Sequence, residues 1–280
     1  MGADRVASLP MYDFPELREA HDVFWTALAE RLAAAGVKDV PRKLTRGAWP
    51  AEVWGDSSLL FAQGCEYPLA KAFGDRVRVV AHPVYSAAGC EGARYRSAVV
   101  VRGRAAPGGG DRGAGVAALA ALRGRRCVVN ELDSNSGMNL LRAAVAPLAT
   151  GGRFFGSIAV SGAHLRSVEM VASGEADVAS IDCVSFAHFQ RLYPALVGEL
   201  RVLSWTASSP SLPYITTRSA SDATVQALRA ALADVFADDE LASVRQQLLL
   251  QGVDLEPAEG FGEVLALERG AANSGYQVIR

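Results

Sequence analysis

Apolar residues along the chain follow two alternating spacings. Short runs rich in Val, Leu, Ile and Tyr are followed by stretches in which apolar residues return every three or four positions. The first spacing is typical of strands and the second of amphipathic helices. In the first third of the chain this pattern predicts strands at residues 5–12, 58–63 and 77–81, and helices at residues 15–35 and 66–73.

The alternation resumes after a polar segment. Residues 103–115 are crowded with Gly, Pro, Arg and Asp, so we predict a solvated loop there. The segments beyond it are predicted as helices at 116–122, 137–148 and 164–173, strands at 127–130, 157–160 and 176–181, and a long helical region at 222–251. Extended runs at 95–101 and 200–205 flank this block and are predicted to cross between two lobes.

This order of elements predicts an α/β fold of two lobes, each a mainly parallel sheet flanked by helices. Lobe 1 is discontinuous and comprises residues 1–95 and 206–280, whereas residues 96–205 form the inserted lobe 2. Ligands of open α/β sheets bind beyond the carboxyl ends of the strands. We therefore expect the ligand in the cleft between the two lobes.

Composition narrows the class of partner. The chain has 280 residues, half of them hydrophobic, and its 28 Lys and Arg nearly balance its 30 Asp and Glu. This balance gives no attraction to nucleic acid or to an anionic membrane surface. Charged residues interrupt every apolar stretch before it reaches the roughly 18 residues of a membrane span, so no direct membrane insertion is expected. The partner should be a small molecule.

The start of the chain and the cysteines bear on the compartment. Residues 1–5 lead directly into the first predicted strand, with no visible signal peptide, so the protein is either cytoplasmic or periplasmic with its leader removed. The four cysteines lack metal-ligand spacing, and no metal site is expected. A Cys65–Cys90 disulfide and two buried thiols would fit an oxidising compartment.

The segment from Val128 to Leu141 carries the clearest chemistry. A strand is followed by a turn of hydroxyl and amide residues and then by an apolar helix. The first N–H groups of a helix have no internal partner and favour a negatively charged oxygen. Ser134 and Ser136 would add hydroxyl donors, and Gly137 would leave room beside the backbone. The alternative is that a serine only caps the helix.

A second segment repeats this arrangement at residues 157–168, where Ser161 and His164 lie at the start of the following helix. The two helix starts can converge on one anion. His164 would donate a hydrogen bond to it; the alternative is a histidine bonded to a turn carbonyl. Asp182 follows the next buried strand and would accept a hydrogen bond from a protonated ligand oxygen, or else cap a helix beginning near Val184.

Two strand-to-helix turns of the first lobe offer neutral groups. Tyr12 follows the first predicted strand and Gln63 ends the second, so both are predicted ligand contacts. Tyr67 is more typical of a core tyrosine. Residues 209–214 contain two prolines and are predicted to form a stiff segment at the edge of the cleft.

These motifs resemble a known family. Their order and spacing over residues 5–255 are similar to the PhnD-like phosphate, phosphite and phosphonate receptors of ABC transporters. The matching segments are residues 133–139, 160–164, 174–179, 181–182 and 212–214. The resemblance implies a type II periplasmic-binding fold, with Ser134, Asn135 and Ser136 at the oxyanion and Tyr12, His164 and Asp182 as further contacts. The chain departs from the family in lacking a leader, a lipobox cysteine and a clear ligand residue at 63–66.

Three functions compete. The favoured one is a monomeric receptor that captures a phosphorus oxyanion for an ABC-transporter permease. The second is a cytoplasmic enzyme of menaquinone- or thiamine-pathway type. The third is a cytoplasmic sensor or an orphan binding protein without a transporter. The sequence has no G-x-S-x-G elbow, P-loop or dinucleotide fingerprint, so neither catalysis nor a cofactor is expected. The predicted site lacks Lys and Arg, which favours a protonated phosphate or phosphonate over sulfate.

Overall fold

The computed structural model describes residues 5–103, 116–257 and 261–280. The chain divides into two compact units. The first comprises residues 1–86, 91–93 and 210–261, and the second comprises residues 87–90, 94–209 and 262–280. Each unit contains a five-stranded sheet in the described part of the chain, and a two-stranded ribbon joins β4 (Arg94–Tyr95) to β10 (Ser209–Pro210).

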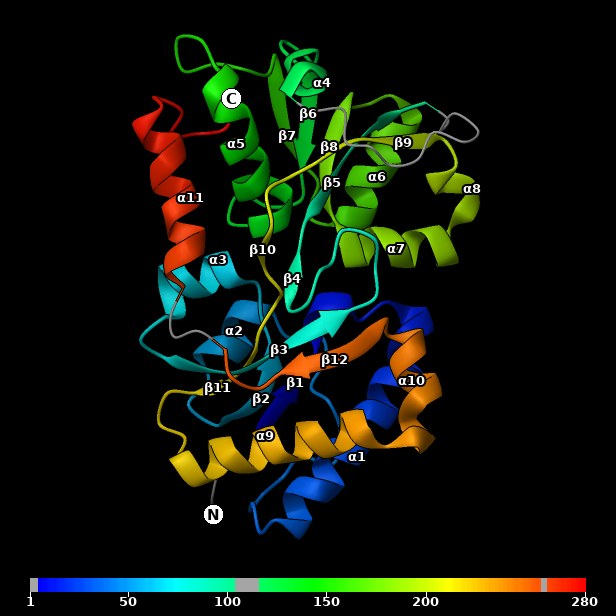
Figure 1. Ribbon diagram of the computed structural model, residues 1–280, viewed down its shortest axis with the longest axis vertical. Helices are drawn as coiled ribbons and strands as arrows, with labels where there is room; N and C mark the ends of the chain where they lie inside the picture. Colours follow the sequence, from blue (N-terminus) through cyan, green and yellow to red (C-terminus); the bar gives the residue numbers. More distant parts are fainter. Residues whose placement is uncertain (1–4, 104–115, 258–260) are drawn as a thin grey trace. The chain divides into compact units, whose positions relative to one another are not determined.

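The sheet of the first unit has the order β1-β2-β11-β3-β12 (Figure 1). Its strands are β1 (Val6–Ser8), β2 (Leu59–Gln63), β3 (Val77–Tyr85), β11 (Tyr214–Thr217) and β12 (Leu250–Asp254). β1 is parallel to β2, while β11 is antiparallel to both β2 and β3, and β12 is antiparallel to β3. Thus β1, β2 and β3 run in one direction and the other two described strands run in the opposite one.

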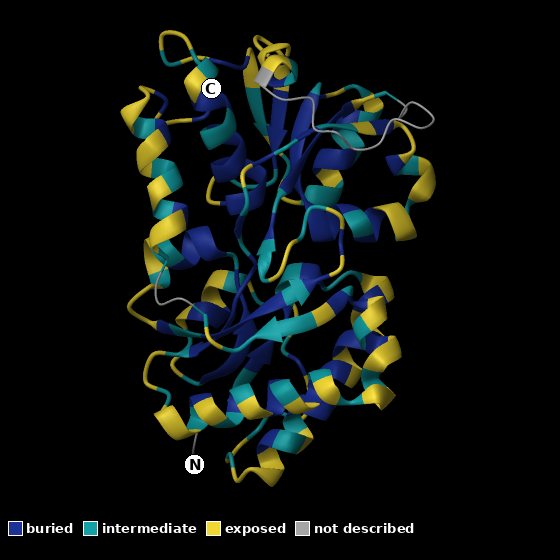
Figure 2. Cartoon of the chain, in the orientation of Figure 1, coloured by how far each residue is buried: buried dark blue, intermediate teal, exposed yellow. Residues whose placement is uncertain are grey.

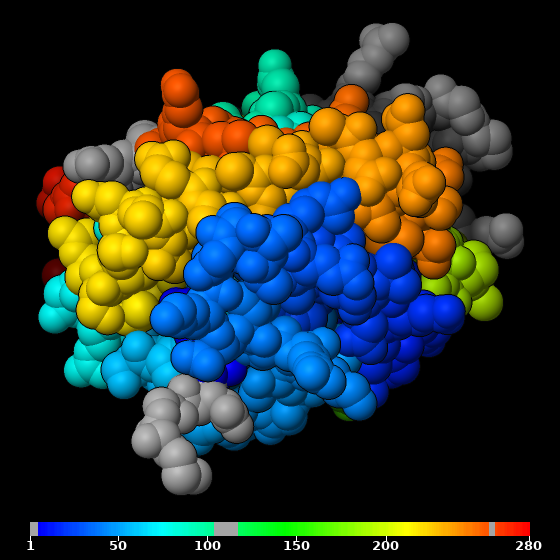
Figure 3. Space-filling model, turned by 90° about the horizontal axis from the view of Figure 1, so that it is seen from below, coloured from blue at the N-terminus to red at the C-terminus, as the bar shows by residue number. Residues whose placement is uncertain are grey.

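Helices cover this sheet with their apolar sides. They are α1 (Arg18–Ala34), α2 (Pro50–Gly55), α3 (Glu66–Pro68), α9 (Asp222–Ala237) and α10 (Ala242–Gln247), with a π-helical turn at Leu69–Phe73. α9 packs on β3 and β12, and α1 packs on α9 and α10. Figure 3 shows α9, in yellow to orange, beside the blue N-terminal region on the outer face. Trp25 of α1 stacks on Phe61 of β2 with ring centroids 5.9 Å apart.

The sheet of the second unit has the order β7-β6-β8-β5-β9. Its strands are β5 (Ser97–Arg102), β6 (Arg126–Val129), β7 (Ser157–Val160), β8 (Val178–Asp182) and β9 (Leu200–Trp205). β6 is parallel to β7 and β8, whereas β5 is antiparallel to β8 and β9. Of these described strands, only β5 opposes the common direction. The predicted α/β fold is therefore confirmed, but both described sheets are mixed and not mainly parallel: one of the four strand pairings in the first unit and two of the four in the second are parallel.

The helices of the second unit flank this sheet, whose strands β5 and β8 are the most buried (Figure 2). They are α4 (Val116–Ala120), α5 (Leu140–Val145), α6 (His164–Ser173), α7 (Cys183–Leu192), α8 (Pro194–Val197) and α11 (Gly262–Asn273). α6 packs on β5, β6 and β8, and α11 packs on α5. Gly174 ends α6 in the left-handed conformation, with φ of 83°, which glycine adopts without steric cost.

Several elements differ from those predicted. The first strand ends at Ser8 because Pro10 begins a short 3₁₀ turn, Pro10–Tyr12. β11 and β12 were not predicted, and the helical region taken to residue 251 ends at Gln247. Residues 262–280, placed in lobe 1 by the sequence, group with the second unit. Residues 104–115 of the predicted loop lie outside the described part of the chain.

The predicted Cys65–Cys90 disulfide is not formed. All four cysteines are free thiols, and Cys90 Sγ lies 3.3 Å from Cys183 Sγ instead. Cys127 and Cys183 are the buried thiols. The partner of Cys90 could not be predicted from sequence, because 93 positions separate the two residues.

Candidate functional site

The turn after β6 carries the first predicted cradle. Ser134 is the N-cap of the π-helical turn η4 (Asn135–Asn139), and its Oγ accepts a hydrogen bond from the Gly137 N–H at 3.0 Å. Ser134 and Ser136 Oγ atoms lie 3.4 Å apart and both residues are buried. The capping role considered from the sequence is thus real for Ser134, and it places the two hydroxyls side by side.

The starts of two helices meet at Ser136 and His164. His164 is the first residue of α6, and its Nε2 lies 2.9 Å from Ser136 Oγ. Ser180 of β8 donates its hydroxyl to the Ser136 carbonyl at 2.7 Å, which fixes the turn to the sheet. Two helix starts that are 28 residues apart in the sequence therefore converge. We call Ser134, Ser136 and His164 the paired helix starts.

His164 carries no charge at neutral pH. Burial lowers the pKa of its ring to about 4, because no group nearby offsets the loss of hydration of the imidazolium. The residue as a whole is only partly buried, but ring Nδ1 is inaccessible and has no hydrogen-bond partner in the described structure. The ring is therefore a neutral hydrogen-bonding group at the start of α6.

Gly137 is required for a reason that the sequence did not reveal. A Cβ built at this position would lie 1.8 Å from Asn130 Oδ1 and 2.9 Å from its Cγ. The space beside the backbone is thus filled by the Asn130 amide, which follows β6 directly. Gly137 therefore has this packing role, and the prediction that it makes room for a ligand stays a prediction.

Asn135 directs its side chain into the protein. Its Nδ2 donates to the Tyr95 hydroxyl and to Ser209 Oγ, each at 2.9 Å, and its Oδ1 accepts from Asn139 Nδ2 at 3.0 Å. Asn139 Oδ1 in turn accepts from the Arg142 guanidinium at 2.7 Å. These five side chains form a hydrogen-bonded network that stabilises the turn on its buried side. The Asn135 side chain is therefore bonded within the second unit, and its role toward a ligand stays a prediction.

Ser161 and Asp182 make local hydrogen bonds. Ser161 Oγ lies 2.7 Å from Ser167 Oγ and donates to the Ala163 carbonyl at 2.9 Å, which shapes the turn before α6. Asp182 is buried and its Oδ1 accepts from the Ser185 N–H at 2.8 Å, so it caps α7. The capping alternative foreseen for Asp182 is realised, and its role toward a ligand stays a prediction.

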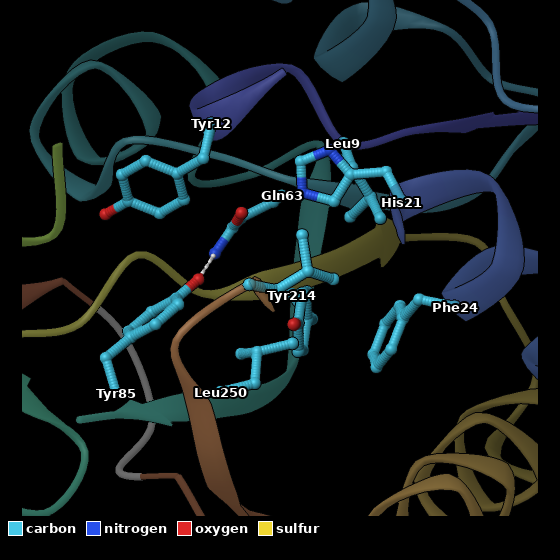
Figure 4. Close-up of a pocket in the computed structure, with 9 residues that line it drawn as sticks. Leu9, Tyr12, His21, Phe24, Gln63, Tyr85, Tyr214 and Leu250 are labelled. Carbon is cyan, nitrogen blue, oxygen red and sulfur yellow. Dashed lines mark hydrogen bonds between the residues drawn. The ribbon is translucent and has the colours of Figure 1, made fainter. Parts of the chain in front are cut away.

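The two predicted contacts of the first unit lie together (Figure 4). Gln63 Nε2 donates to the Tyr85 hydroxyl at 2.8 Å and to the Leu212 carbonyl at 3.1 Å. The Tyr12 and Tyr85 rings meet edge to face with centroids 5.5 Å apart. All three line a cavity of about 10 Å³, enough for a single water molecule. Both amide donors of Gln63 are occupied, so this side chain presents an acceptor.

Several residues of these networks were not predicted as site residues, Tyr95 and Ser209 among them. Tyr85, Asn139 and Arg142 fall inside predicted or extended elements, and no turn signal marks them. Across residues 5–103, 116–257 and 261–280 no group of three or more His, Cys, Asp or Glu side chains is arranged to hold a metal ion. Among the helices that the structure describes, none is long and apolar enough to cross a bilayer.

Comparison with known proteins gives one family match. The family described as "ABC transporter, phosphonate, periplasmic substrate-binding protein" matches residues 6–259. No curated protein matches the chain.

Solved structures share the fold. PhnD1 from Prochlorococcus marinus in complex with methylphosphonate has a TM-score of 0.72 and 13% identity, over 97% of this chain and 99% of that one. A binding-protein component of an ABC phosphonate transporter from Pseudomonas aeruginosa has a TM-score of 0.72 and 14% identity, over 98% and 88%. XAC2383 from Xanthomonas citri bound to chloride has a TM-score of 0.69 and 13% identity, over 99% and 100%. At these identities the likeness establishes the two-lobed fold.

Proposed function

Because the chain belongs to the family of periplasmic substrate-binding proteins of phosphonate ABC transporters, we propose that it captures a small phosphorus oxyanion. Phosphate, phosphite and phosphonates form this class of ligand. The paired helix starts bind the oxyanion, with Ser161 and Asp182 of the same unit as further predicted contacts. Tyr12 and Gln63 are the predicted contacts of the first unit. The bound ligand is delivered to an ABC-transporter permease.

One observation carries this proposal: the 2.9 Å approach of Ser136 Oγ to His164 Nε2 at the starts of two helices. The buried Nδ1 has no partner in the described structure, and an acceptor is less costly to leave unpaired than a donor. The proton therefore resides on Nε2, which donates to Ser136. The serine keeps its own O–H for the ligand, and unpaired N–H groups of the first helical turn add to it.

The ligand should carry a proton. The predicted contacts include hydroxyls, amides, a neutral imidazole and one carboxylate, but neither Lys nor Arg. Gln63 presents an acceptor, and the Asp182 carboxylate is also an acceptor, to which a ligand O–H would donate. Monoprotonated phosphate or phosphonate supplies an O–H, whereas sulfate at neutral pH does not. Binding of sulfate as tight as that of phosphate would contradict this assignment.

A thermal-shift panel tests the proposal. Phosphate, phosphite, methylphosphonate, 2-aminoethylphosphonate and sulfate are each added to the purified chain. A ligand at a hundred times its Kd stabilises the folded state by about 2.7 kcal/mol, which raises the melting temperature. Ser136→Ala should weaken binding about 10- to 100-fold, because a hydrogen bond to a charged group contributes about 1.5–3 kcal/mol.

The matched control is Ser173→Ala, an exposed serine at the other end of α6, which should bind like the wild type. A panel without any shift, or equal binding by the Ser136→Ala variant, would refute the proposed site. As a receptor, the chain should also return the ligand unchanged after prolonged incubation, as ³¹P NMR would reveal. A monomer in the periplasm is the state that we infer for this function.

A further inference from the structure

Two cysteines that are far apart in the sequence lie side by side in the second unit. Cys90 Sγ and Cys183 Sγ are 3.3 Å apart, with 93 positions between the residues. Cys90 ends the tight turn at residues 87–90, which the Cys90 N–H closes by donating to the Ala87 carbonyl at 3.0 Å. Cys183 is the first residue of α7.

The backbone on both sides fixes this approach. Gly89 has φ of +98°, and a Cβ there would lie 2.6 Å from the Trp205 ring and 3.1 Å from Cys183 Cβ. The turn thus passes directly over the start of α7, where only glycine fits. The Cys183 N–H donates to the Arg96 carbonyl at 3.2 Å, which ties the start of the helix to the segment between β4 and β5.

We propose that Cys90 and Cys183 form a disulfide bond when the protein meets a disulfide oxidant. The sulfurs of a disulfide are about 2.0 Å apart, so closing the bond requires an approach of only about 1.3 Å. Rotation about two cysteine side chains supplies such a movement, and the backbone stays in place. Cys65 and Cys127 remain thiols.

The reaction is an exchange with a small or protein disulfide. Cys90, the more accessible thiol, attacks the oxidant and releases one of its two sulfurs as a thiol. Cys183 then loses its proton and attacks the Cys90 sulfur, and the second thiol of the oxidant leaves. The pair loses two protons and two electrons, and the oxidant disulfide is reduced to two thiols.

Cys183 is the slower partner. Its hydrogen bond with Cys90, its burial and the neighbouring Asp182 carboxylate raise the pKa of the Cys183 thiol, so little thiolate is present at neutral pH. The order of attack follows, with the more exposed Cys90 reacting first. The product links the turn at 87–90 covalently to the residue that follows Asp182, a predicted ligand contact.

Peptide mapping under non-reducing conditions tests the proposal. The full chain is incubated with glutathione disulfide, blocked with a maleimide in denaturant and digested with trypsin. Cleavage after arginine places Cys90 in the peptide 79–94 and Cys183 in the peptide 167–191. We expect these two peptides to appear as one cross-linked species that reductant separates, with Cys65 and Cys127 labelled.

Stability provides a second readout. Oxidation should raise the melting temperature of the wild type by at least about 4 °C, because cross-linking distant residues restricts the unfolded chain. The increase should vanish in Cys90→Ser and persist in the control Cys65→Ser. Maleimide on Cys90 and Cys183 after oxidation would overturn the proposal, as would a lasting glutathione adduct on Cys90 or a Cys65–Cys90 linkage.

Discussion

His164 shows how one buried ring couples the candidate site to pH. Folding removes the imidazole from water, which lowers its pKa from the ordinary 6.5 to about 4. Between these values the unfolded chain binds a proton that the folded chain does not. The unfolded state therefore gains stability relative to the folded state as the pH falls.

Replacing His164 should reduce the loss of unfolding free energy that occurs as the pH falls from 7 to 4.5. From pH 7 to pH 4.5 the wild type should lose roughly 2–3 kcal/mol of unfolding free energy through this group, because each unit of pKa shift is worth about 1.4 kcal/mol. His164→Gln keeps a side chain that donates a hydrogen bond, yet has no such titration. Urea unfolding at several pH values measures both curves. They should run parallel above pH 7, and parallel curves down to pH 4.5 would contradict this role.

The residues of the candidate site differ in how far the sequence could predict them. Ser134, Ser136 and His164 could be found because each lies at a strand-to-helix turn, where unpaired N–H groups gather. The hydrogen bonds of the Asn135 side chain inside the protein could not be predicted, because its partner Ser209 is 74 positions away in the sequence. The packing of Gly137 on Asn130 was equally hidden, since it depends on a rotamer and not on spacing.

At the scale of elements, the turn η4 is stabilised from its buried side. Arg142, on the following helix α5, is buried and donates to the Gln277 carbonyl at 3.0 Å and to Asn139 Oδ1 at 2.7 Å. Asn139 Nδ2 also donates to the Val264 carbonyl at 3.1 Å. The network therefore connects the turn to α11 and to the end of the chain. Removing one of its hydrogen bonds should destabilise the turn.

Arg142→Met should destabilise the protein by about 2–5 kcal/mol. Methionine fills a similar volume but leaves the buried Asn139 Oδ1 and the partly buried Gln277 carbonyl without this donor. Urea unfolding should give a lower midpoint at an unchanged slope. Arg123→Met is the control, because Arg123 also donates to a carbonyl, that of Leu148, but is exposed. Equal effects of the two substitutions would show that burial of the network contributes nothing.

Elements with a clear period could be predicted, and short or ambiguous ones could not. β2, β6, β7, β8 and β9 were found within about two residues because apolar runs between turn signals mark them. β12 was mistaken for the end of a helix, since Leu248, Leu249 and Leu250 continue the apolar pattern. The helix stops there because Leu249 adopts φ of 58°, a left-handed conformation that leucine rarely takes.

At the scale of the whole molecule, the end of the chain belongs to the second unit. The carbonyl of Arg280 accepts from the N–H groups of Phe154 and Phe155 at 2.7 and 3.1 Å. Tyr276 and Val264 are fully buried. The sequence placed these residues with the first unit because the helical region before them packs there. The local sequence contains no signal that residues 262–280 pack on the second unit.

A chain that ends at residue 261 should therefore lose the structure of the second unit. It lacks the backbone acceptors for Arg142, Phe154 and Phe155, each worth about 1–3 kcal/mol, and the burial of two apolar side chains, each worth about 1.5–3 kcal/mol. The total approaches the whole stability of a typical domain, about 5–15 kcal/mol. Hydrogen exchange followed by mass spectrometry measures the loss, because it reports protection strand by strand.

The pattern of exchange discriminates between two kinds of folding. Loss of protection in β5–β9, with β1–β3 and β11 still protected, means that the units fold separately and that α11 stabilises only the second. Equal loss in both sheets means that the chain unfolds as one cooperative body, which the division into two units does not require. Val278→Ala is the control within the same segment, because Val278 is 62% exposed and its substitution should leave every strand protected. Full protection in the truncated chain would refute the stabilising role of residues 262–280, which contain both α11 and the Arg280 carbonyl that accepts from the N–H groups of Phe154 and Phe155.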